Sequence, residues 1–522
     1  MTIAPEATTG APVSASPLQA QAGAFVSEVR RRLLGVEARF EPYTWLALGV
    51  VTLIAGILRF VGLDRPKGKI FDEIYYATDA HNLWRLGYEW DEKANTAGYV
   101  VHPPLGKWLI GLGEQIFGYN ELGWRFSAAL FGTLSVLMLM IVAKKLFSST
   151  VLACAAGLLM TFDGMHFVLS RSALLDMFLM FFVLAAFTCL VFDRDQRRRR
   201  WVRFVEAGGD PTGRGRGSRP GFAVPWWRLA AFAMIALAFS VKWSAFAFIP
   251  IMVVLVYWWE IGTRRSLGVR HPIVDTILDE TGWFLVAVVL FAGIYLTSWS
   301  GWLLTDGGYN RHWMRDSGQT ELPVIGALQN LWHYHLQAYD FHTHLDDAHT
   351  YQSWPWQWLL LARPVAFYWV STDPCGAGSC AAEVVLLGTP VLWWSFLPAL
   401  AGLIWLGIAR RDWRAGAILG FIALAWLPWF YYELDNRTMF FFYALPMEPF
   451  LILAVVYVLG SLINPRPDGR GTDSSRTVGA VVLGVYVLLV ALNFAYFYPI
   501  FTGQSIPYDD WLQRMWLGNR WI

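Results

Sequence analysis

The chain has 522 residues, of which 56% are hydrophobic and only 15% are charged. A water-soluble protein of this length keeps a polar exterior, and this composition cannot supply one, so we expect most of the surface to face lipid. The net charge of +2 gives no general electrostatic case for a nucleic-acid partner.

Residues 1–44 are expected to form a cytoplasmic tail that ends in a basic juxtamembrane segment. The first 24 residues or so are rich in Ala, Ser, Thr, Pro and Gly, and they lack the basic start and cleavage pattern of a signal peptide. This composition predicts disorder. The first spanning helix is then expected to serve as the insertion signal.

Apolar runs that could cross about 30 Å of hydrocarbon, which takes about 20 residues, recur along the rest of the chain. We place them at 45–63, 126–147, 151–169, 173–192, 226–241, 243–259, 281–299, 384–408, 416–431, 438–460 and 478–498. These runs predict an all-α polytopic membrane protein with about 11 transmembrane helices, in a single domain over residues 45–522.

Basic residues stand at every second junction between these runs, which predicts a cytoplasmic N-terminus. The junctions carry Arg30 to Arg32, Lys144 and Lys145, Arg197 to Arg200, Arg264 and Arg265, Arg410 and Arg411, and Arg466 with Arg470 and Arg476. Lys242 interrupts a long apolar stretch, and reading that stretch as one helix would give ten spans and put the later basic loops outside. The charge bias therefore favours a break at Lys242.

Three connecting segments are too polar or too long to be simple turns. Residues 64–125 and 300–383 are expected outside the cell, where Ile74 to Leu86 and Trp354 to Trp369 suit amphipathic helices lying at the membrane interface. Residues 193–225 are rich in Arg and Gly and are expected to be a disordered cytoplasmic loop able to meet anionic head groups.

Asp72 and Glu73 are adjacent carboxylates placed directly after the first apolar run. One interpretation is a solvated interfacial pair. The other is a general base, because neighbouring Tyr75, Tyr76 and Trp84 create an apolar setting that raises a carboxylate pKa.

Charged residues within or beside the apolar runs are costly unless they are paired or solvated. They are Arg125, Asp163, Arg171, Asp176, Lys242, Glu433, Asp435 and Arg437. Arg171 and Asp176 could form an ion pair between two helices. Lys242 has no acidic neighbour in sequence, and with Arg125 it is well placed for a lipid phosphate.

Three other groups of residues leave alternatives open. The turn at His102 to Lys107 is either a loop stiffened by two prolines or a place where His102 bonds a carboxylate or a sugar. The histidines His333, His335, His342, His344 and His349 match no zinc spacing, so we expect no metal there. Cys375 and Cys380 either form a short-loop disulfide, if their loop faces an oxidising compartment, or remain free thiols.

An ordered set of motifs runs from about residue 45 to the end of the chain. The motifs are Phe71-Asp72-Glu73, His102-Pro103-Pro104-Leu105-Gly106-Lys107, Gly123-Trp124-Arg125, Ser170-Arg171 with Leu175-Asp176, Val241-Lys242-Trp243, Ser353-Trp354-Pro355-Trp356 with Arg363-Pro364 and Tyr368-Trp369, Leu387-Gly388-Thr389-Pro390 with Trp393-Trp394, and Asn436-Arg437 with Phe442-Tyr443. No single motif is specific, but the set resembles the protein O-mannosyltransferase family, glycosyltransferase family 39 of the GT-C class. Other GT-C enzymes share the early acidic motif and lack the later Trp-Pro-Trp and Leu-Gly-Thr-Pro motifs.

The resemblance implies a GT-C fold and transfer of mannose from polyprenyl phosphate mannose to Ser or Thr hydroxyls of secreted polypeptides. The transfer would invert the anomeric carbon, at the extracytoplasmic face of the cell membrane. Asp72 would match the catalytic base, and Glu73 the second acid, which helps to place the acceptor. Residues 300–383 are too few to hold the MIR domain of fungal and animal members, which points to a bacterial, actinobacterial-type member with a polyprenol lipid.

Further site residues follow from the same resemblance. Those expected at the donor phosphate or sugar are Arg125, Lys242, His102, Arg171 and Arg437. Further candidates for contacts with the acceptor or donor are Tyr76, His344, Trp354 and Tyr443.

The chemistry that these residues permit agrees with that assignment. A carboxylate can take the proton of an attacking alcohol while cations stabilise the departing phosphate, so we expect no cofactor and no divalent metal. Expected partners are the lipid-linked donor, secreted acceptor polypeptides, membrane lipids and the Sec translocation machinery. The alternatives are another GT-C transferase acting on lipid or cell-wall glycan and, less favoured because no internal repeat is present, a transporter or flippase.

Overall fold

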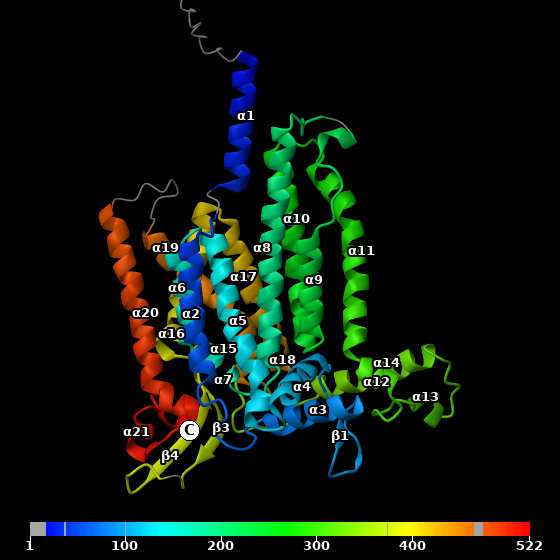
Figure 1. The fold of residues 1–522 in the computed structure, drawn as a ribbon, viewed down its shortest axis with the longest axis vertical. Coiled ribbons are helices and arrows are strands. Elements are labelled where there is room, and N and C mark those ends of the chain that lie inside the picture. The colour runs from blue at the N-terminus through cyan, green and yellow to red at the C-terminus, as the bar shows by residue number, and fades with distance from the viewer. Residues whose placement is uncertain (1–16, 36–37, 100, 214, 373, 464–472) are drawn as a thin grey trace, which may run out of the picture.

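The computed structural model describes residues 17–35, 38–99, 101–213, 215–372, 374–463 and 473–522. Within these ranges the chain is mostly helical, and its long helices stand side by side in one bundle (Figure 1). Short helices and strands cover one end of the bundle, which is the lower end in Figure 1.

Nine helical stretches among the described residues are long and apolar enough to span a membrane. The helices that form them are α2 (Pro42–Phe60), α5 (Glu121–Phe147), α8 (Asp176–Glu206), α10 (Ile249–Ser266) preceded by η2 (Trp243–Phe248), α11 (Pro272–Ser298), α16 (Pro390–Arg410), α17 (Trp413–Trp426) followed by α18 (Pro428–Leu434), α19 (Glu448–Ile463) preceded by η3 (Phe441–Met447), and α20 (Asp473–Thr502). Two shorter apolar helices, α6 (Thr150–Thr161) and α9 (Trp226–Phe239), stand among them. The multi-pass membrane character is therefore confirmed, and the exact number of crossings stays a prediction.

The expected break in the stretch around Lys242 is present. Helix α9 ends at Phe239, Lys242 has an extended backbone, and a separate helical segment begins at Trp243. The run predicted at 151–169 is also interrupted, because α6 ends at Thr161 and Asp163 caps the short helix α7 (Gly164–Leu169) by accepting from the backbone N–H of His166. Both breaks place a charged residue at a helix end, where backbone groups without helical partners can be satisfied.

The basic turns gather at the upper end of the bundle in Figure 1. Lys145, in the last turn of α5, pairs with Asp195 of α8 at 3.3 Å, and Arg197 of α8 pairs with Glu260 of α10 at 2.9 Å. These pairs bring the C-terminal parts of α5, α8 and α10 to the same end of the bundle.

Two segments expected to be disordered contain helix. Residues 17–34 of the tail form α1 (Pro17–Leu34), while residues 1–16 lie outside the described residues. Helix α8 continues to Glu206 through half of the loop expected at 193–225, and η1 (Arg216–Ser218) follows. The physical reason is an apolar stripe between the arginines of α8, where Trp201 and Val205 bury against Val29 of α1.

The segment expected at 64–125 forms the lower end of the bundle near the chain's first spanning helix. It contains α3 (Glu73–Leu86), the β1 (Trp90–Asp91) and β2 (Thr96–Ala97) hairpin, and α4 (Leu105–Phe117), and α3 and α4 lie across the bundle end (Figure 1). The predicted helix at Ile74 to Leu86 is confirmed. It ends at Gly87, whose φ of 87° is a left-handed conformation that glycine adopts without strain.

The segment expected at 300–383 is only partly helical. It contains α12 (Ser300–Leu304), α13 (Trp313–Asp316), α14 (Ile325–Thr343), α15 (Pro355–Trp358), and strands β3 (Val365–Val370) and β4 (Cys380–Leu386). The prediction of an interfacial helix at Trp354 to Trp369 is wrong beyond its first turn. Pro364 disfavours helix in the preceding residue, and the β-branched and aromatic residues after it suit a strand.

A small antiparallel sheet therefore supplements the all-α prediction. Strand β4 pairs with β3 and with β5 (Ser505–Pro507), and α21 (Tyr508–Leu512) and η4 (Gly518–Arg520) complete the chain. The spanning run predicted from residue 384 begins only at Pro390, since residues before it belong to β4 and a short loop and Pro favours the first turn of a helix.

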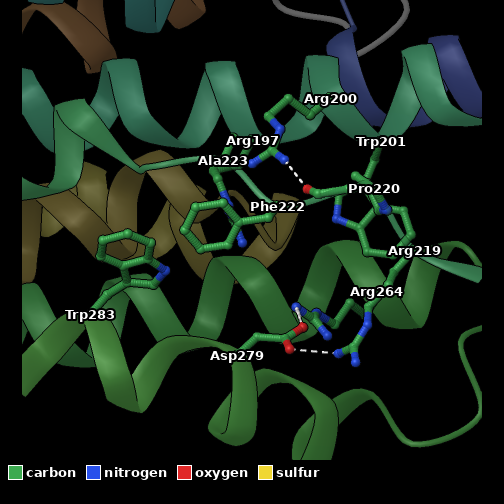
Figure 2. A pocket seen from close by; sticks show the side chains of 11 residues that line it. Arg197, Arg200, Trp201, Arg219, Pro220, Phe222, Ala223, Arg264, Asp279 and Trp283 are labelled. Carbon is green, nitrogen blue, oxygen red and sulfur yellow. Dashed lines mark hydrogen bonds and ion pairs between the residues drawn. The ribbon is translucent and has the colours of Figure 1, made fainter. Parts of the chain in front are cut away.

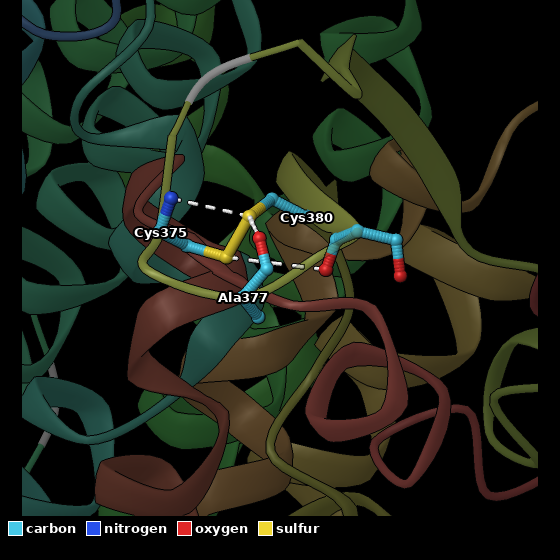
Figure 3. The surroundings of a disulfide bond; sticks show 4 residues. Cys375, Ala377 and Cys380 are labelled. Carbon is cyan, nitrogen blue, oxygen red and sulfur yellow. Dashed lines mark hydrogen bonds between the residues drawn. A yellow bond between two sulfur atoms is a disulfide. The ribbon is translucent and has the colours of Figure 1, made fainter.

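The β3–β4 connection carries the two loop cysteines. Cys375 and Cys380 are joined in a disulfide with their Cα atoms 5.8 Å apart (Figure 3). The backbone N–H of Cys375 also points at Sγ of Cys380 at 3.1 Å. Of the two states left open by the sequence, the structure has the bonded one, while Cys154 and Cys189 are free thiols.

Candidate active site

The acidic pair lies at the start of α3, in a turn fixed by aromatic packing. Phe71, the residue before the pair, has a φ of 45°, which is rare for a large side chain and requires support from its surroundings. Its ring stacks on Phe367 of β3 with centroids 4.5 Å apart, and the edge of Phe442 lies 5.9 Å away. Residues from three distant parts of the chain therefore set the direction of Asp72.

Glu73 is completely buried and forms an ion pair with Arg125. Nε and Nη2 of Arg125 each donate to one oxygen of Glu73 at 2.8 Å. Glu73 also accepts from the backbone N–H of Ile70 at 3.0 Å and of Ala173 at 2.9 Å. The carboxylate is thus bound on both oxygens and ties α3 to α5 and to the residues before α8.

Arg125 has no exposed surface, and none of its N–H groups is left to bind a substrate. Its Nη1 donates to the carbonyl of Pro66 at 2.8 Å, and its Nη2 to the carbonyl of Gly68 at 3.0 Å, in addition to the bonds to Glu73. A buried guanidinium satisfied in this way stabilises the fold of the loop before α3.

Arg171 is likewise occupied by backbone carbonyls. Its Nη1 and Nη2 donate to the carbonyls of Arg59 and Val61 at 2.9 and 2.8 Å and of Gly62 at 2.7 Å, all at the C-terminal end of α2. Carbonyls at this end of a helix lack intrahelical partners, and the helix dipole favours a cation there. The ion pair that could have joined Arg171 to Asp176 is absent among the described contacts, because Asp176 pairs with Lys242 instead.

Lys242 is therefore paired, although its sequence neighbours are apolar. Its Nζ donates to Asp176 at 2.7 Å, and both side chains are at least nine-tenths buried. The ammonium also lies 5.6 Å from the centre of the Tyr443 ring. Asp176 is 66 residues away in the chain, so this pairing could not be read from local sequence.

Asp72 lies close to this ion pair and has a perturbed pKa. Burial raises the pKa of Asp72 to about 6, Lys242 opposes that shift, and Asp176 adds to it. The pKa of the neighbouring Tyr76 is raised by burial and then by Asp72. A carboxyl group with a pKa near 6 is suited to accepting a proton at neutral pH.

A cavity of about 480 Å³ opens beside these groups. Its polar lining comes from His102, Asp176, Lys242, Ser244, Tyr339, His342, Thr343, Tyr432, Arg437 and Tyr443. Its other wall is apolar and includes Phe239, Phe246, Phe248, Leu424 and Pro446. The cavity can therefore receive a molecule that has one polar, anionic end and one hydrocarbon end.

Arg437 is the second cation of this cavity. Its Nε donates to the carbonyl of His342 at 2.7 Å and its Nη1 to the carbonyl of Thr438 at 3.1 Å. Among the described residues no carboxylate lies within ion-pair distance of Arg437, and its Nη2 donates to none of them. The guanidinium therefore lies in the cavity without a neighbouring carboxylate, and Nη2 can donate to a ligand there.

His102 and His342 form a stacked pair in the cavity wall. Their ring centres are 4.9 Å apart, and the ring of Tyr76 lies 6.3 Å from His102. Burial lowers the pKa of His342 to about 4 and the pKa of His102 well below its usual value. Both imidazoles are therefore neutral at pH 7 and can act as hydrogen-bonding groups.

The structure brings together only part of the site expected from the sequence. Of the candidates, His102, Lys242, Arg437 and Tyr443 line the cavity, and Asp72 and Tyr76 lie beside it. His344 and Trp354 do not line the cavity. His344 is exposed and lies 3.1 Å from Asp340, and Trp354 stands at the N-terminal end of α15. Over the ranges that the structure describes, no group of three or more His, Cys, Asp and Glu residues is arranged to hold a metal ion.

Several polar residues of the cavity were not site candidates from the sequence, namely Asp176, Ser244, Tyr339, His342, Thr343 and Tyr432. The sequence marks Asp176 as a costly charge, a possible partner of Arg171 and part of a family motif, and His342 as a member of a histidine group. The signal for Asp176 was its place at the start of an apolar run opposite Lys242, where each charge needs a partner.

Comparison with known families covers most of the chain. Residues 49–209 match the family model described as dolichyl-phosphate-mannose-protein mannosyltransferase, and residues 327–521 match the C-terminal four-transmembrane region of protein O-mannosyltransferase. A Mycolicibacterium smegmatis protein named polyprenol-phosphate-mannose–protein mannosyltransferase is 39% identical over 91% of this chain and 92% of its own length. A Corynebacterium glutamicum protein of the same name is 33% identical over 92% and 93%.

Solved structures show the same fold. The Saccharomyces cerevisiae protein O-mannosyltransferase Pmt1–Pmt2 complex bound to the sugar donor matches with a TM-score of 0.70 at 14% identity, over 95% of this chain and 94% of that one. ArnT from Cupriavidus metallidurans matches with a TM-score of 0.51 at 16% identity, over 87% and 70%. The GT-C fold is therefore confirmed, and the chain belongs to the protein O-mannosyltransferase family.

Proposed function

We propose that this chain transfers mannose from polyprenyl phosphate mannose to Ser or Thr hydroxyls of secreted proteins. The names of its mycobacterial and corynebacterial relatives support both the lipid-linked donor and the protein acceptor. The observation that carries the mechanism is the position of Asp72, with its pKa of about 6, next to a cavity that holds Lys242 and Arg437.

Asp72 is the proposed base of the reaction. As the acceptor oxygen forms its bond to the anomeric carbon, the hydroxyl proton passes to Asp72, and the bond from that carbon to the phosphate oxygen breaks. A direct displacement of this kind inverts the anomeric carbon and needs one carboxylate rather than a nucleophile and an acid.

Lys242 and Arg437 are the proposed phosphate ligands. The leaving phosphate gains negative charge as the bond breaks, and cations already in place stabilise that charge without reorganising. Asp176 holds the Lys242 ammonium in position, and the carbonyl of His342 holds Arg437. The apolar wall of the cavity would receive the first isoprene units of the donor lipid.

Glu73, Arg125 and Arg171 are better explained as residues that position Asp72. The sequence resemblance predicts Arg125 and Arg171 at the lipid-linked sugar donor. In the structure, the N–H groups of both guanidiniums are instead bound by Glu73 and by backbone carbonyls. We propose that Glu73 and Arg125 hold the first turn of α3, and that Arg171 holds the end of α2 against the start of α8.

The remaining candidates keep more peripheral roles in this proposal. His102 and Tyr443 line the cavity and suit contacts with the mannose, and Tyr76 suits a contact near Asp72. His344 and Trp354 lie outside the cavity and remain candidates for holding the acceptor polypeptide. We propose that the reaction needs no divalent metal, because Lys242 and Arg437 supply the positive charge that the phosphate requires.

The proposed location is the plasma membrane, with the N-terminus in the cytoplasm and the cavity at the extracytoplasmic side. The support is the distribution of charge. The basic last turns of α5, α10 and α16 lie at the end of the bundle opposite α3, and basic residues are retained on the cytoplasmic side. Acceptors would then arrive as unfolded secreted chains, which makes the Sec machinery a reasonable partner.

The function is tested by incubating the purified protein with labelled polyprenyl phosphate mannose and a Thr- and Pro-rich peptide. Mannosylated peptide is the expected product, with an inverted anomeric linkage, and it should form equally in the presence of a chelator. Labelled glycan or lipid without labelled peptide would instead favour another GT-C transferase. Movement of intact donor across a vesicle membrane without any transfer would favour a flippase.

A further inference from the structure

A second cavity, of about 460 Å³, lies among the basic turns at the end of the bundle opposite α3 (Figure 2). Its charged lining is Arg197, Arg200, Arg219, Arg264 and Asp279, and its aromatic walls are Trp201, Phe222 and Trp283. None of these residues belongs to the proposed transfer site.

The cavity has an excess of positive charge. Figure 2 shows Arg219 and Arg264 sharing one carboxylate, Asp279, with Arg264 donating at 2.8 Å. Arg200 donates to the backbone carbonyl of Gly221 and, among the described residues, has no carboxylate within ion-pair distance. Three guanidinium groups thus face a single carboxylate in this lining.

The charge of Arg197 is not available to a ligand in the same way. It pairs with Glu260 at 2.9 Å and with Glu280 at 2.5 Å, and both carboxylates are buried and lie outside the cavity lining. Arg197 therefore joins the cavity lining to the buried ion pairs of α9, α10 and α11. Among the described residues of the lining, the other three cations, Arg200, Arg219 and Arg264, have only the carboxylate of Asp279 to balance them, so the cavity keeps a net positive charge.

The rim of the cavity meets the lipid-facing side of the bundle. Phe222 is 87% exposed and its ring lies against Trp283 of α11, with centroids 5.8 Å apart. Only 11% of the residues in the most apolar stretch of α11 are buried in the protein. Ile277 and Leu278, beside Asp279, are exposed. Apolar side chains next to guanidinium groups match a molecule whose phosphate lies directly above hydrocarbon.

We propose that this cavity binds the head group of an anionic phospholipid of the surrounding bilayer, with the phosphate on Arg200, Arg219 and Arg264 and the acyl chains along α11. A soluble phosphate would use the same cations but would gain nothing from Phe222 and the exposed face of α11. Planar guanidinium groups suit phosphate oxygens because they donate two parallel hydrogen bonds.

The test is native mass spectrometry of the full chain in detergent, titrated with phosphatidylglycerol or with phosphatidylcholine of the same acyl chains. Phosphatidylglycerol should be retained and phosphatidylcholine should not, a comparison that needs no variant. Arg200→Gln and Arg219→Gln should each weaken retention about fivefold, the equivalent of about 1 kcal/mol per cation at an anionic surface. Arg200→Lys, which keeps the charge, should retain most of the binding.

Arg265→Gln is the matched control, because Arg265 is an exposed arginine of the same end of α10 that does not line the cavity. Equal losses in Arg265→Gln and Arg200→Gln would show a general surface charge effect and overturn the proposal. Equal retention of the two lipids would overturn it as well. Glycerol phosphate alone binding as tightly as phosphatidylglycerol would assign the cavity to a soluble anion and also overturn it.

Discussion

Glu73 and Arg125 are joined by two parallel hydrogen bonds of 2.8 Å, and neither side chain has any exposed surface. This pair separates the roles of two adjacent acids. Glu73 is committed to the fold, whereas Asp72 has a raised pKa and lies beside the cavity. The same acidic motif therefore contains one structural carboxylate and one carboxylate with a pKa suited to proton transfer.

Breaking the Glu73–Arg125 pair should damage the fold more than donor binding. Glu73→Gln and Arg125→Met should each lower the free energy of unfolding by about 3 to 5 kcal/mol, because the partner is left as an unpaired buried charge. The measurement is thermal unfolding of the purified variants, with donor affinity measured on the folded fraction. A stable Arg125→Met protein that has lost donor affinity would contradict this assignment and return Arg125 to the phosphate site.

Lys242 should contribute to donor binding beyond neutralising Asp176. Lys242→Met should weaken donor affinity by about tenfold to a hundredfold, the value of a charge-assisted hydrogen bond. The control is Lys242→Met combined with Asp176→Asn, which removes the unpaired carboxylate as well as the cation. Donor affinity should stay low in the double variant, and recovery would show that Lys242 acts only on Asp176.

The reaction should need both the positive charge of Arg437 and the paired N–H groups of its planar guanidinium. We expect Arg437→Gln to lower kcat/KM for the donor by about tenfold to a hundredfold and Arg437→Lys to recover part of it, since Lys keeps the charge but not the paired donors. Arg85→Gln is the matched control, because Arg85 is an exposed arginine of α3 outside the cavity. Steady-state kinetics at varied donor concentration gives the answer. An unchanged KM in Arg437→Gln would remove Arg437 from the donor site.

The transfer rate should rise with pH through about 6. The pKa of Asp72 is raised to about 6, and a base must be deprotonated, so activity is lost below that pH and present above it. His342, with a pKa of about 4, and His102, whose pKa is also lowered by burial, are already neutral there and cannot account for the rise. The pH dependence of kcat/KM between pH 5 and pH 8 measures it, because this ratio reports the pKa values of the ligand-free protein. A ratio that is flat across pH 6 would contradict the role of Asp72.

The sequence predicted most of the apolar helices because a segment that crosses hydrocarbon must be apolar over about 20 residues, whether it faces lipid or, like α8, packs inside the bundle. The break at Lys242 and the helix after Asp72 were also predicted correctly. Predictions were weaker outside the apolar runs. Trp354 to Trp369 resembled an interfacial helix, while its strand depends on pairing with β4 from a later part of the chain.

The site was predicted in its residue types more than in its contacts. The free-energy cost of a charge in or beside a membrane-spanning segment correctly marked Arg125, Arg171 and Lys242 as residues that need partners. They could not show that Arg125 pairs with Glu73 and Lys242 with Asp176, since these partners lie 52 and 66 residues away. Which cation remains available to a ligand is therefore a property of the fold.

The central claim is that Asp72 removes the acceptor proton, and Asp72→Asn tests it most directly. Asparagine keeps the size and polarity of the side chain but cannot take the proton. Protein preloaded with labelled donor should show a single-turnover transfer rate at least about a hundredfold lower, while donor affinity stays within about twofold of the unmodified protein. A near-normal transfer rate would contradict the account, as would a loss of donor affinity large enough to explain the lower rate.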